Sequence, residues 1–366
     1  MNAECEMGKS NVGQRARRTS LMGLAAAFSG AALWGVSGTC AQFLQENYGM
    51  SPLLLTLVRM LCGGALFVAV IVATRREELR TVLRNRALMK SLLVFGCAGL
   101  FPSQITYIVC IGYTNAGTAT VLQAGSVVFV MLAACLLARK LPRCGDVLAL
   151  FLALAATLCL ATQGQLDGLR IPSQGLFWGL LNAASVALYI MYPKVKGVYA
   201  HCSSFTATGV GMVLGSGAAA LFCVGVLLLQ SLGAVDGVGA VCTVLGAGST
   251  GGAEGMGGAG GAVAADAFTA QSLVWNMVFP ALDASGWLAL AGVVLVGAFA
   301  AYGLYMYGVS VVGPVKGALL GTMEPVGAMA VAACWLRTPF SLWDWAGLAL
   351  MVATTVLVSR SDAEAV

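Results

Sequence analysis

The sequence predicts an all-α integral membrane protein with ten transmembrane helices. Hydrophobic residues make up 59% of the 366 residues, charged residues only 10%, and the mean hydropathy is +0.88. Globular proteins carry about 25% charged residues. Ten apolar stretches are each long enough to cross a bilayer, which takes roughly 20 residues as a helix. The basic residues between these stretches are distributed as an even number of crossings requires.

The first stretch follows a polar tail, residues 1–20, that contains Lys9, Arg15, Arg17 and Arg18. It runs from Leu21 to about Leu44, longer than the roughly 7–15 residues of a cleaved signal-peptide core, so we predict an uncleaved first helix. The other nine predicted spans are 52–74, 88–111, 115–138, 144–163, 174–193, 203–230, 285–310, 314–336 and 341–359. Residues 360–366 form a second short tail.

The orientation is predicted from the loops. Seventeen of the 20 Lys and Arg residues fall on the side of the N-terminus, two (Arg170 and Arg337) on the other side, and Arg59 lies inside a span. Because basic loops stay in the cytoplasm, we predict a multi-pass protein of the cytoplasmic (plasma) membrane with both termini cytoplasmic.

One external loop, residues 231–284, is much longer than the other joints. Its centre, from Gly246 to Gly258, has the composition of a flexible glycine-rich linker. A passive insertion is the favoured interpretation, and a tethered lid over an outer opening stays open as the alternative.

The ninth stretch holds an acid beside a proline, Glu324-Pro325. A carboxylate in the middle of a membrane helix costs about 3 kcal/mol on insertion scales, so it faces a partner or a wet cavity. Pro325 has no N–H for the carbonyl of Gly321, so we predict a helix break at Gly321 and Pro325. A solute site is one interpretation, and a packing kink with a structurally paired acid is the other.

Arg59 is the other charged residue well inside a span, and its depth brings it within reach of Glu324 for an ion pair. Snorkelling or capping of carbonyls by Arg59 is the alternative. We predict that polar and aromatic residues of other spans complete a substrate-binding site, although each one could instead serve helix packing. They are Trp34, Gln104, Tyr107, Gln123, Asn182, Tyr189, Tyr302 and Tyr305. No metal site or cofactor is predicted, because His201 is the only histidine and the sequence has no Cys-x-x-Cys pair.

The chain repeats itself weakly. Residues 130–137 (VMLAACLL) resemble residues 329–336 (MAVAACWL), about 199 residues later. The predicted halves, 21–163 and 174–359, hold five spans each. An odd number inverts the second half in the membrane, which is the architecture of many secondary transporters.

The chain resembles the EamA-type carriers of the drug/metabolite transporter superfamily. The resemblance rests on Ser51-Pro52 with Arg59, on the stretch from Tyr107 to Ala119, and on residues 318–325 (ALLGTMEP). It implies two five-helix halves around a central cavity and transport of small metabolites, often export. Gly125-Ser126 stands where the second half has Glu324-Pro325, and Arg139 and Thr338 replace acids that the family often has. Two symmetric acid sites are therefore not expected.

Together these features predict a secondary transporter that moves a small metabolite by alternating access, with export as the implied direction. The solute is expected to be neutral or zwitterionic, and either amino-acid-like or drug-like; coupling to protons is left open. The expected partners are this solute and the lipid bilayer, with no nucleic acid. A membrane sensor or scaffold is the alternative. An intramembrane enzyme is disfavoured and no catalytic residue is predicted, because Ser37 of a rhomboid-like Gly35-Val36-Ser37-Gly38 has no base in reach: His201 is placed in a cytoplasmic loop.

Overall fold

The computed structural model describes residues 2–114, 116–139, 141–142, 144–162, 172–231, 279–327 and 342–363, and every regular element in these ranges is a helix. The predicted insertion lies outside the described residues except at its two ends.

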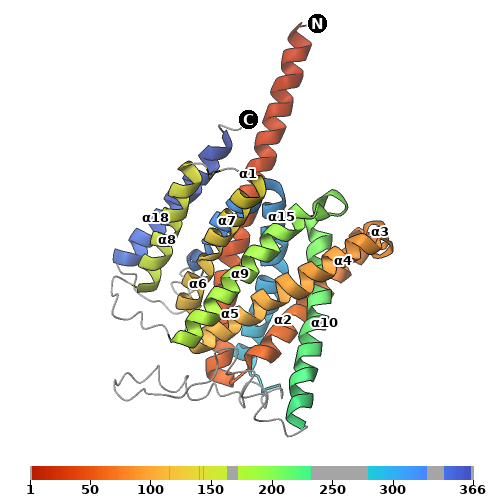
Figure 1. Cartoon of the computed structure of the whole chain (residues 1–366), viewed down its shortest axis with the longest axis vertical. Coiled ribbons are helices and arrows are strands. Elements are labelled where there is room, and N and C mark those ends of the chain that lie inside the picture. The colour runs from red at the N-terminus through yellow and green to blue at the C-terminus, as the bar shows by residue number, and fades with distance from the viewer. Residues whose placement is uncertain are drawn as a thin grey trace.

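The N-terminal part of the chain contains α1 (Asn2–Tyr48), α2 (Pro52–Thr74), α3 (Arg76–Arg84), α4 (Arg86–Val94), the π-helix η1 (Phe95–Leu100), α5 (Phe101–Tyr113), α6 (Ala116–Ala124), α7 (Ser126–Ala138) and α8 (Cys144–Thr162). The C-terminal part contains α9 (Ser173–Val195), the 3-10 turn η3 (Val198–Ala200), α10 (Ser204–Ser231), α14 (Ala284–Ala291), the π-helix η4 (Gly292–Ala301), α15 (Tyr302–Val312), α16 (Pro314–Gly321) and α18 (Leu342–Ala363). α1 already begins at Asn2, so the predicted N-terminal tail continues this helix and projects beyond the bundle (Figure 1).

Seven helical stretches in the described part are long and apolar enough to cross a membrane: Arg18–Tyr48, Pro52–Thr74, Arg86–Tyr113, Thr118–Ala138, Ser173–Val195, Ser204–Gly225 and Ala284–Val312. Shorter apolar helices, Cys144–Ala156 and Trp345–Thr354, occupy the places of the predicted fifth and tenth spans. The ninth predicted span is described only as far as Gly327. The fold is thus that of a multi-pass helical membrane protein, and the count of ten spans stays a prediction.

Helices from the two parts of the chain pack against each other in a reciprocal pattern. α2 packs on α10. α8 packs on α18, and these two helices lie side by side at one edge of the bundle (Figure 1). α1 packs along η4 and α15, while α9 packs along η1 and α5. A two-fold relation between the halves would give this pattern, because each contact then recurs with the roles exchanged.

Glycines allow the central helices to approach closely. A Cβ at Gly30 of α1 would lie 2.6 Å from the backbone nitrogen of Tyr305, and a Cβ at Gly308 of α15 would lie 2.5 Å from that of Ala27. Small residues at such positions let membrane helices pack backbone to backbone. α1 and α15 therefore form a tight pair that holds their larger side chains at fixed depths.

Candidate functional site

The predicted ninth span is interrupted where its acid lies. α16 ends at Gly321, Thr322 and Met323 form a turn, and helical backbone resumes over 324–327. The amides of Met323 and Val326 bond to carbonyls three residues back, Leu320 and Met323, at 3.1 and 3.0 Å. Pro325 cannot donate to the carbonyl of Gly321, so the regular ladder stops there. This turn places the Glu324 side chain in the interior of the bundle.

The Glu324 carboxylate is 2% exposed and receives hydrogen bonds from neutral donors of α5 and α6. The Tyr107 hydroxyl donates to Oε1 at 2.5 Å, and the Thr120 hydroxyl donates to the same oxygen at 3.4 Å. The Gln123 amide donates to Oε2 at 2.6 Å. Three donors from the first half of the chain thus hold an acid of the second half.

Arg59 of α2 is 3% exposed and lines the same cavity as Glu324. The ion pairs within 4 Å among the described residues are Arg75–Glu78 and Arg80–Glu77, so Arg59 and Glu324 do not form a contact pair there. Within the same part of the chain, the buried Arg59 Nε and Gln104 Nε2 have no hydrogen-bond partner. The cavity therefore combines these two unbonded donors with the Glu324 carboxylate, which already accepts three hydrogen bonds.

Aromatic rings form one wall of the cavity. The Trp34 ring lies 4.7 Å from that of Tyr302 and 4.6 Å from that of Tyr305, centroid to centroid. Trp34 Nε1 donates to the carbonyl of Gly297 at 3.2 Å, inside the π-helix η4, and the Tyr305 hydroxyl donates to that of Gly317 at 2.9 Å. π-helical segments are frequent at functional sites because they alter the direction of side chains and carbonyls.

The cavity itself is small, with a volume of about 20 Å³. An adjoining hollow of about 20 Å³ shares Trp34, Gln123, Tyr189 and Glu324 with it and adds Tyr305. A single water needs about 10–15 Å³ measured in this way. The cavity is therefore contracted, with room for about one water in each of its two hollows.

The structure brings nearly all of the predicted site residues together. Those that line the cavity are Trp34, Arg59, Gln104, Tyr107, Gln123, Tyr189, Tyr302 and Glu324, and Tyr305 lines the adjoining hollow. Asn182 is the exception: its amide donates to the Ser103 carbonyl at 2.7 Å and to the Thr106 hydroxyl at 3.2 Å, which joins α9 to α5.

Sequence reasoning missed Ser103, Thr120 and Val186, which also line these hollows. Thr120 precedes Gln123 by three residues and so shares its helix face, a spacing that could have revealed it. Ser103 and Val186 carried no comparable signal.

The fold and this buried polar site define a multi-span helical membrane protein with a central cavity. A sequence model of the EamA-like transporter family matches residues 21–162 and 262–360, more than half of the chain. The chain belongs to the EamA-like transporter family, and hence to the drug/metabolite transporter superfamily; it is a membrane transporter rather than an enzyme.

An "uncharacterized inner membrane transporter YicL" of Salmonella typhimurium is 27% identical over 329 residues, which cover 90% of this chain and 92% of that protein. A solved crystal structure superposes with a TM-score of 0.57 at 16% identity, over 94% of this chain and 96% of the other. At that identity the second comparison shows the fold alone.

Proposed function

We propose that this protein is a secondary transporter that moves a small neutral or zwitterionic metabolite across the cytoplasmic membrane by alternating access. The observation that carries the proposal is the triple hydrogen bonding of Glu324 by Tyr107, Thr120 and Gln123. An acid of one half that is held by donors of the other lies where secondary transporters bind their solute, between their two repeats. Export is the direction that the family resemblance implies.

The two halves, 21–163 and 174–359, are proposed to be inverted five-helix repeats. Two irregularities recur at a similar offset and support this proposal. The π-helices η1 and η4 begin at Phe95 and Gly292, and the breaks in the fourth and ninth predicted spans fall at Gly125 and at Thr322–Met323. Discontinuous helices at corresponding positions of two halves are typical of inverted-repeat transporters.

A zwitterionic solute is supported by the opposed chemistry of the cavity. Arg59 Nε and Gln104 Nε2 are donors with no partner among the described residues, and such donors suit a carboxylate. Glu324 keeps acceptor capacity beyond its three hydrogen bonds, because a carboxylate has about four acceptor positions, and this capacity suits an amine or a proton carried in exchange. The faces of Trp34 and Tyr302 add apolar surface that also attracts a cation.

The test is solute flux in proteoliposomes with purified protein and a panel of labelled zwitterionic and neutral metabolites. Glu324→Gln should lower flux of the accepted solute at least about 100-fold, because it removes the charge and keeps the shape. Glu46→Gln, the same change at an exposed acid near the outer end of α1, is the matched control and should transport normally. Absence of flux for every solute by the wild type would favour a sensor or scaffold, and normal flux by Glu324→Gln would contradict the assigned site.

A further inference from the structure

A second and larger hollow lies on the outside of the bundle, between the start of α10 and the helix formed by η4 and α15. Its volume is about 580 Å³, and it shares no residue with the polar cavity. Phe299, Gly303, Leu304 and Tyr307 line one side, and Phe205 lines the other. Leu304 and Tyr307 are 39% and 38% exposed, so the hollow opens sideways. Both flanking helices are candidate membrane spans by length and composition, and the hollow opens between them.

The groove is polar at one end and apolar along its length. Arg75, Ser203, Ser204 and Ser310 lie at the end of the groove where α2 ends and α10 begins. From Ser310 the groove follows its helix back to Phe299, a distance of about 16 Å at 1.5 Å per residue. This length corresponds to about half of a 30 Å hydrocarbon core.

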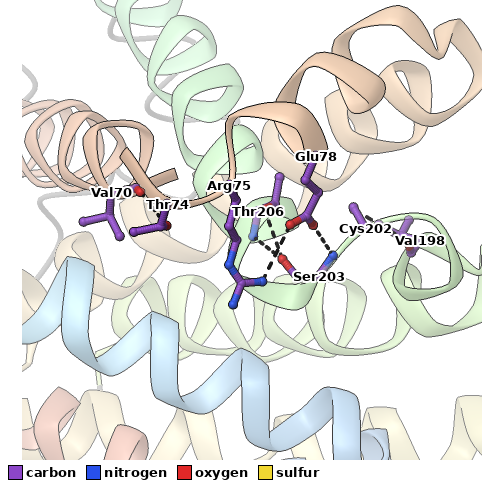
Figure 2. A network of polar contacts seen from close by, with 8 residues as sticks. All are labelled: Val70, Thr74, Arg75, Glu78, Val198, Cys202, Ser203 and Thr206. Carbon is purple, nitrogen blue, oxygen red and sulfur yellow. Dashed lines mark hydrogen bonds and ion pairs between the residues drawn. The ribbon is translucent and has the colours of Figure 1, made fainter. Parts of the chain in front are cut away.

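Arg75 supplies a cation at the polar end. Its Nη1 lies 3.6 Å from Glu78 Oε2, longer than the 2.7–2.9 Å typical of a charge-assisted hydrogen bond, and 47% of its side chain is exposed. The pair orients the guanidinium without occupying its full set of donors. In Figure 2 the Arg75 side chain points away from the α2–α3 corner, toward the pale blue helix of the region around residue 300.

Glu78 is held in place by a different contact. It accepts the backbone N–H of Ser203 at 2.5 Å, just before α10, as Figure 2 shows. Burial alone would raise the pKa of Glu78, but hydrogen bonds from Ser203 and Thr206 and the charge of Arg75 outweigh it, so the pKa lies below its usual value. Glu78 therefore acts as a fixed support for Arg75 at neutral pH.

The surroundings of this end are strongly basic. Arg76, Arg80, Arg84 and Arg86 lie on the same short segment, on the side that the loops predict as cytoplasmic. The cytoplasmic leaflet carries anionic lipids, and basic pockets between membrane helices on this side bind their headgroups. A cation at the interface above an apolar groove matches an anionic headgroup with an attached chain.

We propose that this groove binds one anionic phospholipid of the cytoplasmic leaflet, with its phosphate at Arg75 and an acyl chain along Phe205, Gly303 and Phe299. The site is independent of the solute cavity, so it stands or falls separately from the proposed transport function.

The test measures retention of two lipids with identical chains, phosphatidylglycerol and phosphatidylcholine, titrated onto delipidated full-length protein and read by native mass spectrometry. Wild type should prefer phosphatidylglycerol. Arg75→Gln should lower that preference about fivefold, the factor for roughly 1 kcal/mol per basic residue at an anionic surface. Arg80→Gln is the charge control, since Arg80 pairs with Glu77 and does not line the groove.

A second pair of variants fills the groove. A Cβ at Gly303 would meet no atom closer than 3.6 Å, so Gly303→Leu should fold and displace the chain, lowering retention of both lipids about tenfold. Gly217→Leu, at an exposed position of α10 with no atom within 4 Å, is its control. If Gly303→Leu fails to fold, the Arg75 and Arg80 variants decide alone.

Three outcomes overturn the proposal. The first is equal retention of the two lipids by wild type. The second is the same loss of phosphatidylglycerol preference in Arg80→Gln as in Arg75→Gln. The third is unchanged lipid retention in a folded Gly303→Leu. If Gly303→Leu lowers solute flux while lipid retention is unchanged, the groove is a lateral path for the solute instead.

Discussion

Glu324 is a buried acid held by neutral groups rather than by a cation. Tyr107 and Gln123 donate to it at 2.5 and 2.6 Å, and no ion pair joins it to Arg59 in the described part of the chain. Neutral donors can reorganise around an uncharged side chain at small cost. Removal of one partner of a buried ion pair instead leaves an unpaired buried charge, which strongly destabilises the protein. This favours the acid as a functional group over the acid as a structural counter-ion of Arg59.

Thermal unfolding should separate these two roles. We expect Glu324→Gln to remain folded in detergent with little change in Tm, because the Gln123 amide can turn to present its oxygen. Adding Arg59→Gln should neither raise the Tm nor restore flux. A large loss of Tm in Glu324→Gln that the double variant recovers would instead establish a structural pair.

Asn182 and Tyr107 were predicted as equivalent site residues, and the structure gives them different surroundings. Asn182→Leu removes the bonds to Ser103 and Thr106 between α9 and α5 and should lower stability by about 1 kcal/mol, with normal flux per folded molecule. Tyr107→Phe keeps the ring but removes the donor to Glu324, and should lower flux about tenfold or more with a small effect on Tm. Flux and Tm measured side by side on both variants check this, and an inverted result would exchange their roles.

Among the elements, the long helices follow from hydrophobic length alone, and their irregularities do not. The sequence places the second and sixth spans within one or two residues of α2 and α9. The helix α3, Arg76–Arg84, lies between two predicted spans, and no apolar stretch marks it because charged residues dominate its composition. No residue type marks the π-helices η1 and η4, whose extra residue per turn depends on packing between helices. Site residues could be selected by polarity within spans, but the direction in which each side chain faces could not, and Asn182 faces α5 rather than the cavity.

The start of α14 carries a polar cap that ties it to α1. Asp283 accepts the Gly286 amide at 2.9 Å and the Ser285 hydroxyl at 2.7 Å, and the Tyr48 hydroxyl of α1 also donates to it. The bond from Tyr48, followed by those from Gly286 and Ser285, lowers the pKa of Asp283 to about 2. The carboxylate form thus links the end of α1 to the start of α14.

This cap predicts a pH dependence. Because the pKa of Asp283 is lower in the folded state than its ordinary value, its stabilising contribution is complete above about pH 4 and is lost as the pH falls toward 2. The Tm of wild type should therefore decrease more steeply between pH 4 and 2.5 than that of Asp283→Asn, which can still cap the helix. Parallel Tm profiles for the two proteins would show that the cap does not respond to pH.

For the whole molecule, the orientation in the membrane is the least constrained property, because apolar helices cross equally well in either direction. Only the basic loops distinguish the sides, and they predict that the segment before α8 is cytoplasmic. Cys144, exposed at the start of α8, is a natural probe of that segment. Cys202 is a poor one, because burial and the charge of Glu78 raise its pKa to about 12 and keep it a thiol.

A variant with Cys144 as its only cysteine should react with an impermeant maleimide in inverted vesicles and not in intact cells. Cys242 lies outside the described residues, in the predicted external insertion, and a Cys242-only variant should react in intact cells. Labelling of Cys144 in intact cells would contradict the predicted orientation and the ten-span count together.

The contracted cavity has a consequence for the energy balance of the cell. With about 20 Å³ of space in each of the two hollows beside Glu324, the cavity has room for about two separate waters rather than a continuous column. A water column would conduct protons and dissipate the membrane potential that the cell maintains. In the part of the chain that the structure describes, the space beside Glu324 therefore offers protons no such column to follow.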